Sequence, residues 1–553
     1  MSQFKAYIFL VISFNSILFC TKNSFAQDFI ENGTLQGNIY SEINYYFKDT
    51  IIGAYKVPEY IRSNIYGNVL YRYKGFNVGV RYEAYQPPLV GFDPRYEGMG
   101  IAYRYASYTD ENYEVTIGNF YDQYGSGIVL RAYEDKNLGI DNSFDGFRIL
   151  ARPINGLEIK GMIGKQRYYW DYGAGTVRGM DAEWNILQTF FPETSTNFSL
   201  GGSAVSRYQV DKDPIFNLPQ NVAAFSGRAS LYSGAFFISS EYAWKVNDPN
   251  ATNNMIYKNG QALILSGSYS QKGLGILLSA KYIDNMDFRS SRTATGNDLT
   301  LNYLPATTYQ HTYSLAGMYP YATQPNGEVG AKAQFNYLIP KGSTVGGKYG
   351  TSVTLNASIA NSIDKKKLND TLAVGTPGTK GYTAKFGSIG DEKYYHDLSV
   401  EVNRKLNSSI KTVAGFSNQF YNKSVIEGHP GEESVKAWIV YADVSFKFKE
   451  NQTIRTEVQH LSTLQDKGSW VMALAEYTVA PKWTVSISDQ FNYGNSDKDL
   501  RKHYYFLQLG YNKGPHRLSL SYGKQRDGII CVGGICRKVP ASFAAGLIFS
   551  TTF

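Results

Sequence analysis

The chain closes on the stretch SFAAGLIFSTTF, Ser542 to Phe553, in which large and small side chains alternate. One set of alternate positions consists of Phe543, Ala545, Leu547, Phe549, Thr551 and Phe553. The other set is small or polar except for Ile548. A period of two is typical of a β-strand with one apolar face. The stretch therefore predicts a strand that ends on an aromatic residue.

The same alternation recurs backward along the chain and again near the N-terminus. The apolar sets are Leu518/Leu520/Tyr522, Tyr505/Leu507/Leu509/Tyr511, Trp483/Val485/Ile487, Ile454/Thr456/Val458, Trp438 to Phe448, Leu398/Val400/Val402, Ile61 to Tyr73, Phe76 to Tyr82 and Leu35 to Phe47. Arg455, Glu457 and Glu401 fall on the opposite faces. Charges are costly in hydrocarbon but suit a water-lined lumen. The pattern predicts an all-β fold, a single antiparallel transmembrane β-barrel.

Composition agrees with a barrel and disfavours a soluble enzyme. Among 553 residues there are 46 Tyr, 31 Phe and 53 Gly but only 3 Cys. Mean hydropathy is −0.32, which does not oppose a barrel, because only every second residue of a spanning strand meets lipid. A soluble propeller would show a repeat of roughly 40–50 residues, and none is found. The net charge of +8 is dispersed, so nucleic acid is not expected as a partner.

Connections of two sizes separate the expected strands. Short ones contain the Gly, Asn and Pro of tight turns, as in Lys74-Gly75, Ser233-Gly234 and Ala480-Pro481. Outer-membrane barrels have short periplasmic turns and long external loops. We expect about 24 strands, within a range of 22–26. With about 24 strands, placing Phe553 on the periplasmic side puts all the short turns there too. Three connections are exceptionally long: 121–143, 283–326 and 362–394.

The N-terminus reads as a secretory signal. Lys5 precedes an apolar core from Ala6 to Phe19, and Ser24-Phe25-Ala26 supplies small residues before a cleavage site. We expect residues 1–26 to be a signal peptide and 27–553 to be the outer-membrane barrel. A membrane anchor is the alternative, although the core is shorter than the roughly 20 residues a span needs. Lipoprotein processing at Cys20 is a second alternative, which the bulky Phe19 disfavours.

Cys531 and Cys536 flank a short Val-Gly-Gly-Ile turn in the last external loop. The compartment is oxidising, so we expect a disulfide that stiffens the tip of this hairpin. A metal site is the rival interpretation, but two thiolates without a nearby His are too few ligands. No cofactor is expected.

No catalytic group stands out from the sequence. The six histidines lack metal-ligand spacing, and His396-Asp397 is the one close pair of a histidine and a carboxylate. Adjacent residues on a strand point to opposite faces, so this pair is not expected to act as acid and base. The sequence predicts that the protein is not an enzyme.

Two resemblances add to this reading. The strand ending at Phe553 resembles the C-terminal assembly signal that the barrel-insertion machinery reads, which implies outer-membrane lipid and that machinery as partners. Gly125 to Asn142 and Gly533-Gly534-Ile535-Cys536 resemble a Bacteroidota-type outer-membrane barrel family of unknown function. That resemblance implies a barrel in the cell outer membrane. It implies no substrate and no site residues.

The connection 121–143 is the candidate constriction of the lumen. A barrel of about 24 strands is wider than a porin of 16–18 strands, so something must narrow it. This connection comes early in the chain and carries Arg131, Glu134, Asp135 and Asp141. We expect these charges to find partners on lumen faces such as those of Arg455 and Glu457. A self-satisfied salt-bridged loop is the alternative interpretation of the four residues.

The leading functional hypothesis is a porin-like channel or facilitated-uptake pore for small polar solutes, because polar strand faces and long loops suit a pore. The alternative is a surface scaffold that docks another envelope protein or glycan without transport. A plugged, energy-coupled transporter is disfavoured, because no plug domain is expected before the first strand. The sequence does not predict an oligomeric state.

Overall fold

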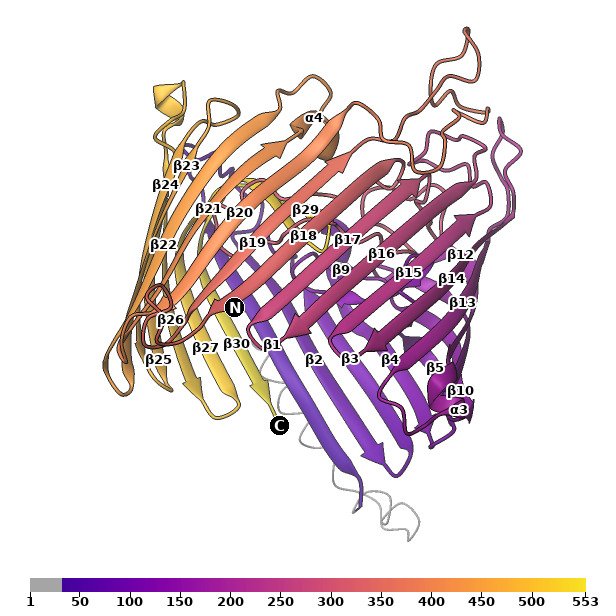
Figure 1. The fold of residues 1–553 in the computed structure, drawn as a ribbon, viewed down its shortest axis with the longest axis horizontal. Helices are drawn as coiled ribbons and strands as arrows, with labels where there is room; N and C mark the ends of the chain where they lie inside the picture. The colour runs from indigo at the N-terminus through magenta and orange to yellow at the C-terminus, as the bar shows by residue number, and fades with distance from the viewer. Residues whose placement is uncertain (1–31) are drawn as a thin grey trace.

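The computed structural model, which describes residues 32–553, is a closed ring of 24 antiparallel strands (Figure 1). Each strand pairs with the next one along the chain, and β1 pairs with β30 to close the ring. Gly37 and Phe553 exchange two backbone hydrogen bonds of 2.9 Å at this seam. The predicted fold class and strand number are confirmed.

The strands of the ring follow the chain in order. They are β1 (Thr34–Phe47), β2 (Ile61–Tyr73), β3 (Phe76–Tyr85), β4 (Gly98–Thr109), β5 (Tyr113–Phe120), β10 (Phe144–Ile154), β11 (Leu157–Tyr168), β12 (Asp171–Asn185), β13 (Asn197–Tyr208), β14 (Asn221–Ser233), β15 (Phe236–Lys245), β16 (Gly260–Gln271), β17 (Leu274–Asp284), β18 (Glu328–Ile339), β19 (Thr351–Asn361), β20 (Lys393–Lys405), β21 (Ile410–Tyr421), β22 (Val435–Lys449), β23 (Gln452–Ser462), β24 (Trp470–Val479), β25 (Trp483–Phe491), β26 (His503–Lys513), β27 (His516–Gln525) and β30 (Ser542–Thr552).

Small elements lie in the connections. They are the 3-10 turns η1 (Pro94–Tyr96) and η2 (Lys498–Leu500), the short helices α3 (Ile186–Phe190) and α4 (Lys423–Ile426), the two-residue strands β6 (Gln123–Tyr124), β7 (Leu130–Arg131), β8 (Glu134–Asp135) and β9 (Ile140–Asp141), and the hairpin of β28 (Gly528–Val532) and β29 (Ile535–Val539). No helix among residues 32–553 is long and apolar enough to cross a membrane.

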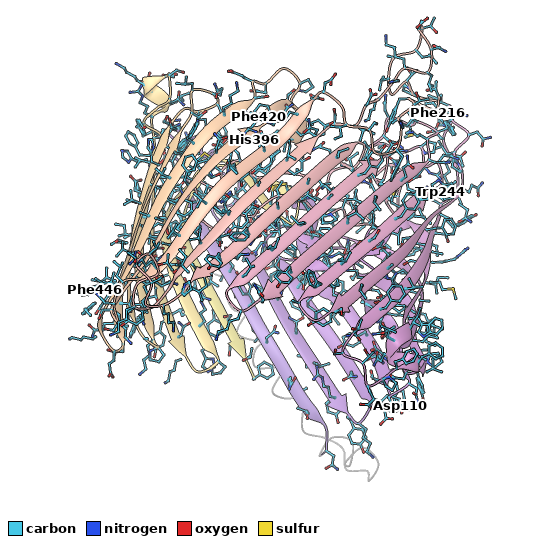
Figure 2. All side chains as sticks on the ribbon, in the orientation of Figure 1. Asp110, Phe216, Trp244, His396, Phe420 and Phe446 are labelled. Atoms are coloured by element: carbon cyan, nitrogen blue, oxygen red, sulfur yellow. A yellow bond between two sulfur atoms is a disulfide. The ribbon has the colours of Figure 1, made fainter. Side chains whose placement is uncertain are left out.

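The two faces of the wall are those the alternation predicts. On β22, Trp438 is 58% exposed and faces outward, while its neighbour Ile439 is fully buried toward the lumen. Figure 2 shows Trp244, His396 and Phe420 on the wall nearer one rim and Phe446 near the other. The outward face is an apolar belt with aromatic residues toward both edges, which suits a bilayer. Trp470 is not part of this belt, since it packs inward and is 1% exposed.

All the expected short turns lie at one end of the barrel, together with Phe553, because the strands alternate in direction. The long connections lie at the other end, called here the outer end. The three longest run over 121–143, 285–327 and 362–392, and none contains another spanning strand. The expected signal peptide, residues 1–26, lies outside the described residues.

Candidate lumen constriction

Residues 285–327, the crossing segment, reach from one side of the barrel to the other. Near its start, the carbonyl of Thr300 accepts a hydrogen bond of 2.7 Å from Gln166 on β11. Further along, the N–H of Leu315 donates to Gln459 on β23 at 2.8 Å. β11 and β23 stand on opposite sides of the ring. A single connection therefore spans the lumen.

Apolar side chains of the crossing segment fill two clusters against opposite inner walls. Met286, Phe288 and Leu301 are fully buried beside inward residues of β12 to β17, such as Val205. Leu315 and its neighbours pack against inward residues of β20 to β26. Burial of this kind fixes the segment by the hydrophobic effect, so it is a packed part of the barrel interior.

The crossing segment is also fixed by buried polar groups. Lys281 on β17 donates to the carbonyl of Pro305 at 2.6 Å and pairs with Glu328 at 2.7 Å, and its side chain is fully buried. His311 lies 2.6 Å from Asp397 on the inner face of β20. A buried charge is costly unless it is paired and hydrogen-bonded, so these contacts favour one position of the segment.

Residues 121–143, the early connection, dock beneath the crossing segment against the first half of the ring. Tyr124, Ile128 and Leu130 are fully buried in the same apolar cluster. The N–H of Ser126 donates to Glu241 on β15 at 2.8 Å. The N–H of Arg131 donates to the carbonyl of Leu301 at 2.7 Å, which ties the two connections together.

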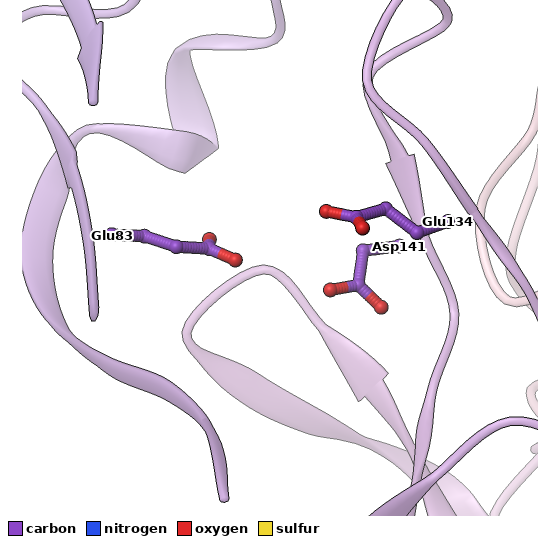
Figure 3. Close-up of side chains that lie close together, drawn as sticks. All are labelled: Glu83, Glu134 and Asp141. Atoms are coloured by element: carbon purple, nitrogen blue, oxygen red, sulfur yellow. The ribbon is translucent and has the colours of Figure 1, made fainter. Parts of the chain in front are cut away.

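An ion-pair cluster anchors the early connection to β3 and β11, and Figure 3 shows its three carboxylates, Glu83, Glu134 and Asp141. Arg81 on β3 pairs with Glu83 at 2.7 Å, with Glu134 at 3.0 Å and with Asp141 at closer range. Arg167 on β11 pairs with Glu83 at 2.7 Å and with Asp141 at 2.6 Å. Apart from Glu134, these side chains are at most 7% exposed. This cluster is called the anchor cluster below.

The three carboxylates of the anchor cluster also have the spacing of a metal site, since their oxygens lie within 4.8 Å of one another. Oxygen ligands of this kind suit a hard divalent cation. However, the guanidinium of Arg81 contacts all three carboxylates and occupies the space between them. The arrangement is therefore an ion-pair network.

The anchor cluster shifts two pKa values in opposite directions. Burial acts to raise the pKa of Asp141, but the positive charges of Arg167 and Arg81 outweigh it, and the pKa lies below its usual 3.8. Burial raises the pKa of Glu134 above its usual 4.5, although Arg81 acts the other way. Asp141 therefore stays ionised at pH values where Glu134 begins to take up a proton.

The four predicted constriction residues are distributed differently from the expectation. Glu134 and Asp141 join the anchor cluster, so their partners are on β3 and β11. Asp135 accepts a hydrogen bond from the N–H of Leu138 at 3.0 Å within its own turn. The guanidinium of Arg131 lies over the rings of Tyr133 and Tyr303, at 4.6 and 4.0 Å from their centroids.

Arg455 and Glu457, the expected partners of these four residues, lie on the far wall and pair with each other instead. Arg455 pairs with Asp443 at 2.7 Å and with Glu457 at closer range. Sequence reasoning missed Arg81, Glu83 and Arg167. The available signal was the Arg81–Glu83 spacing of two, which puts opposite charges on the inward face of one strand.

Cys531 and Cys536 form the expected disulfide. The hairpin that it closes does not project outward as an external tip, because the turn of this hairpin packs on the crossing segment. The carbonyl of Gly533 accepts hydrogen bonds from Tyr303 Oη at 2.9 Å and from the N–H of Ala306 at 3.2 Å. The hairpin of β28 and β29 therefore forms a third part of the packed interior.

The two residues of the His396-Asp397 pair point to opposite sides of the wall, as expected. His396 faces outward and bonds to Asn418 at 2.9 Å, while Asp397 faces inward between His311 and Ser417. In this inward trio the carboxylate lies between the other two groups. The hydroxyl of Ser417 donates to Asp397 at 2.8 Å, and His311 lies on the other side of that carboxylate. An activated serine is paired directly with the histidine or other base that accepts its proton. The trio does not have that arrangement.

Nearer the short-turn end, the inner wall carries ion pairs that remain partly open to solvent. Arg228 on β14 pairs with Asp181 at 2.8 Å and with Glu183 at 2.9 Å, and the side chain of Glu183 is 49% exposed. Arg152 and Lys160 both pair with Glu158, at 3.3 and 3.4 Å. Such half-exposed charges require water, so the lumen below the packed interior is polar.

Several solved structures are similar to this chain in fold. The P pilus usher translocation pore PapC has 11% identity and a TM-score of 0.42, with 94% of this chain and 99% of that chain covered. The siderophore receptor PirA from Pseudomonas aeruginosa has 9% identity and a TM-score of 0.40, with 94% and 80% covered. OccAB3 from Acinetobacter baumannii has 8% identity and a TM-score of 0.34, with 95% and 99% covered.

No curated protein matches the chain. Over residues 3–553 the sequence matches the family described as a family of unknown function, DUF6029, and the chain belongs to that family.

Proposed function

We propose that this chain is an outer-membrane channel for small polar solutes, narrowed at its outer end by its own connections. The observation that carries the proposal is the combination of a polar, half-exposed inner wall with a segment that crosses the lumen above it. A water-filled lumen with a constriction is what selective passage needs. The outward apolar belt supports a place in the bilayer.

The rest of the proposal follows from the same features. We infer export by the N-terminal signal and insertion through the last strand, with Phe553 as the residue read by the insertion machinery. A Bacteroidota source stays an expectation of the sequence. The proposed activity is passive and non-enzymatic, since a pore needs no reacting group.

Conductance of the purified barrel in planar bilayers tests the channel. We expect small, discrete steps, because the crossing segment occupies part of the lumen. The steps should persist after replacement of Arg455 by Gln, since Arg455 contacts only its own wall. Absence of steps from correctly inserted protein would remove the channel proposal.

A second candidate function is a docking scaffold without transport. Its supporting observation is the dense packing of the outer half, where the Arg207–Asp248 ion pair has no exposed surface. Part of the connection 362–392 projects beyond the outer rim in Figure 1, whereas its residues Ile363 and Tyr382 are buried. Such a projecting surface suits a partner. Deletion of this projection separates the two functions. In a channel, the deletion should leave conductance unchanged. In a scaffold, it should abolish binding of the partner.

A further inference from the structure

A cavity of about 390 Å³ lies at the outer mouth, between connections that are far apart in the sequence. Its walls come from residues 91–96, 138–142, 167–169 and 295–299, together with Arg537 of the hairpin. Ligand sites in proteins commonly begin at about this volume. The cavity therefore has room for a molecule of the size of one or two sugar rings.

Most charges in this cavity already have partners. Asp141 and Arg167 belong to the anchor cluster. Arg95 pairs with Asp93 at 2.6 Å and with Asp298 at 2.9 Å. The carboxylates of the cavity are therefore neutralised, and they are not free to attract a cation.

Arg537 is the exception among the charged groups of this cavity. Its Nη1 donates to the carbonyl of Gly91 at 2.9 Å, and its guanidinium lies 4.3 Å from the ring centre of Phe92. Within residues 32–553 no carboxylate lies within ion-pair distance of it, and its buried Nε has no hydrogen-bond partner. Burial lowers the pKa of Arg537, although Asp135 acts in the opposite direction. Its positive charge is thus partly desolvated and has no ion-pair partner among the described residues.

The remaining wall suits a molecule with hydroxyl groups and apolar ring faces. Phe92, Leu138 and Leu299 supply apolar surface, while Asp298 and the hydroxyl of Tyr168, which donates to Asp298 at 3.4 Å, supply polar surface. A sugar ring presents both kinds of surface. A planar guanidinium matches a carboxylate through two parallel hydrogen bonds.

We propose that this outer-mouth cavity binds a small hydroxylated carboxylate, a sugar acid, with its carboxylate held by Arg537. The proposal names the class of solute for the channel proposed above, but binding does not depend on conduction. A barrel that binds a sugar acid and does not conduct would refute the channel alone.

Isothermal titration calorimetry on the folded, full-length barrel in detergent tests the site. Glucuronate is the probe, glucose is the neutral analogue, and acetate is the carboxylate without hydroxyls. We expect glucuronate to bind at least about tenfold more tightly than either control. No binding of glucuronate, or equal binding of acetate, would overturn the proposal.

Two variants and one matched control locate the site. Arg537→Gln should weaken glucuronate binding by about tenfold or more. Arg501→Gln removes an exposed arginine from another outer connection, where Arg501 bonds only to the carbonyl of Asn495, and should leave binding unchanged. Thr295→Trp keeps Arg537 but fills the cavity from its exposed rim, so it should also weaken binding. Binding that survives both Arg537→Gln and Thr295→Trp in folded protein would show that the site lies elsewhere.

Discussion

Arg81→Gln should release the early connection from the barrel wall. Arg81 is the one residue that pairs with all three carboxylates of the anchor cluster, and its side chain is 6% exposed. After the substitution, Arg167 alone faces Glu83 and Asp141. Removing one partner of a buried ion pair costs about 3–5 kcal/mol. Because Gln keeps hydrogen-bond donors, we expect the lower end of this range.

The cost is relieved when the early connection undocks, since the carboxylates of Glu134 and Asp141 then regain water. A change of about 3 kcal/mol shifts the ratio of undocked to docked molecules by roughly 100-fold. The barrel wall itself should persist, because its 24 strands are paired around the whole ring. The variant should therefore insert normally and conduct more.

Limited trypsin digestion and planar-bilayer conductance measure the release. Trypsin cuts after Arg131, which packs over Tyr133 and Tyr303 while the connection is docked, and cleavage there should become faster in Arg81→Gln. Arg455→Gln is the matched control, because Arg455 also faces the lumen and pairs with two carboxylates but does not contact the early connection. If Arg81→Gln inserts normally and changes neither cleavage nor conductance, the anchor cluster does not hold the constriction.

Three further outcomes follow from the same contacts. The pKa of Asp141 is depressed, so its contribution to docking is complete above the unfolded value near 3.8 and is lost only as pH falls through the lower folded value. The pKa of Glu134 is raised, so its protonation as pH falls favours the docked state. Conductance should therefore not rise between pH 7 and pH 5, and a rise would contradict this. Phe553→Ala should reduce the amount of barrel inserted in cells, measured as the heat-modifiable band on a gel. The purified variant should refold normally, because the Phe553 side chain is 63% exposed. Normal insertion of the variant in cells would refute the role of Phe553 as a signal. Leu278→Arg places a charge on the outward belt and should cost roughly 2–4 kcal/mol of unfolding free energy in lipid vesicles. Ser279→Arg is the control, because this position faces the lumen and the substitution should cost little. Equal costs would mean that the outward face does not meet lipid.

The wall of the barrel could be predicted from sequence because its rule is local. A one-residue slip would turn every side chain of a strand to the other face, so alternation alone places Trp438 outside and Glu457 inside. The bounds of the long connections also follow, since turn residues and the loss of alternation mark both ends of 121–143.

The packed interior could not be predicted in the same way, because its contacts join distant residues. Asp141 pairs with Arg81 and Arg167, and His311 pairs with Asp397, without any shared local pattern. In the sequence, a polar residue on an inward face gives the same pattern whether its side chain meets water or packs against a connection. The same ambiguity explains Trp470, whose place at a strand end suggests an interfacial girdle although its ring packs inward.

Uptake of polar solutes into proteoliposomes is the decisive test of the proposed channel. Vesicles that contain the wild-type barrel, Arg81→Gln or no protein are compared over a series of neutral sugars of increasing size. We expect faster entry of the smallest sugars with the wild-type barrel than with lipid alone, and entry of larger sugars with Arg81→Gln. Entry no faster than in protein-free vesicles, for both correctly inserted proteins, would contradict a channel narrowed by its own connections.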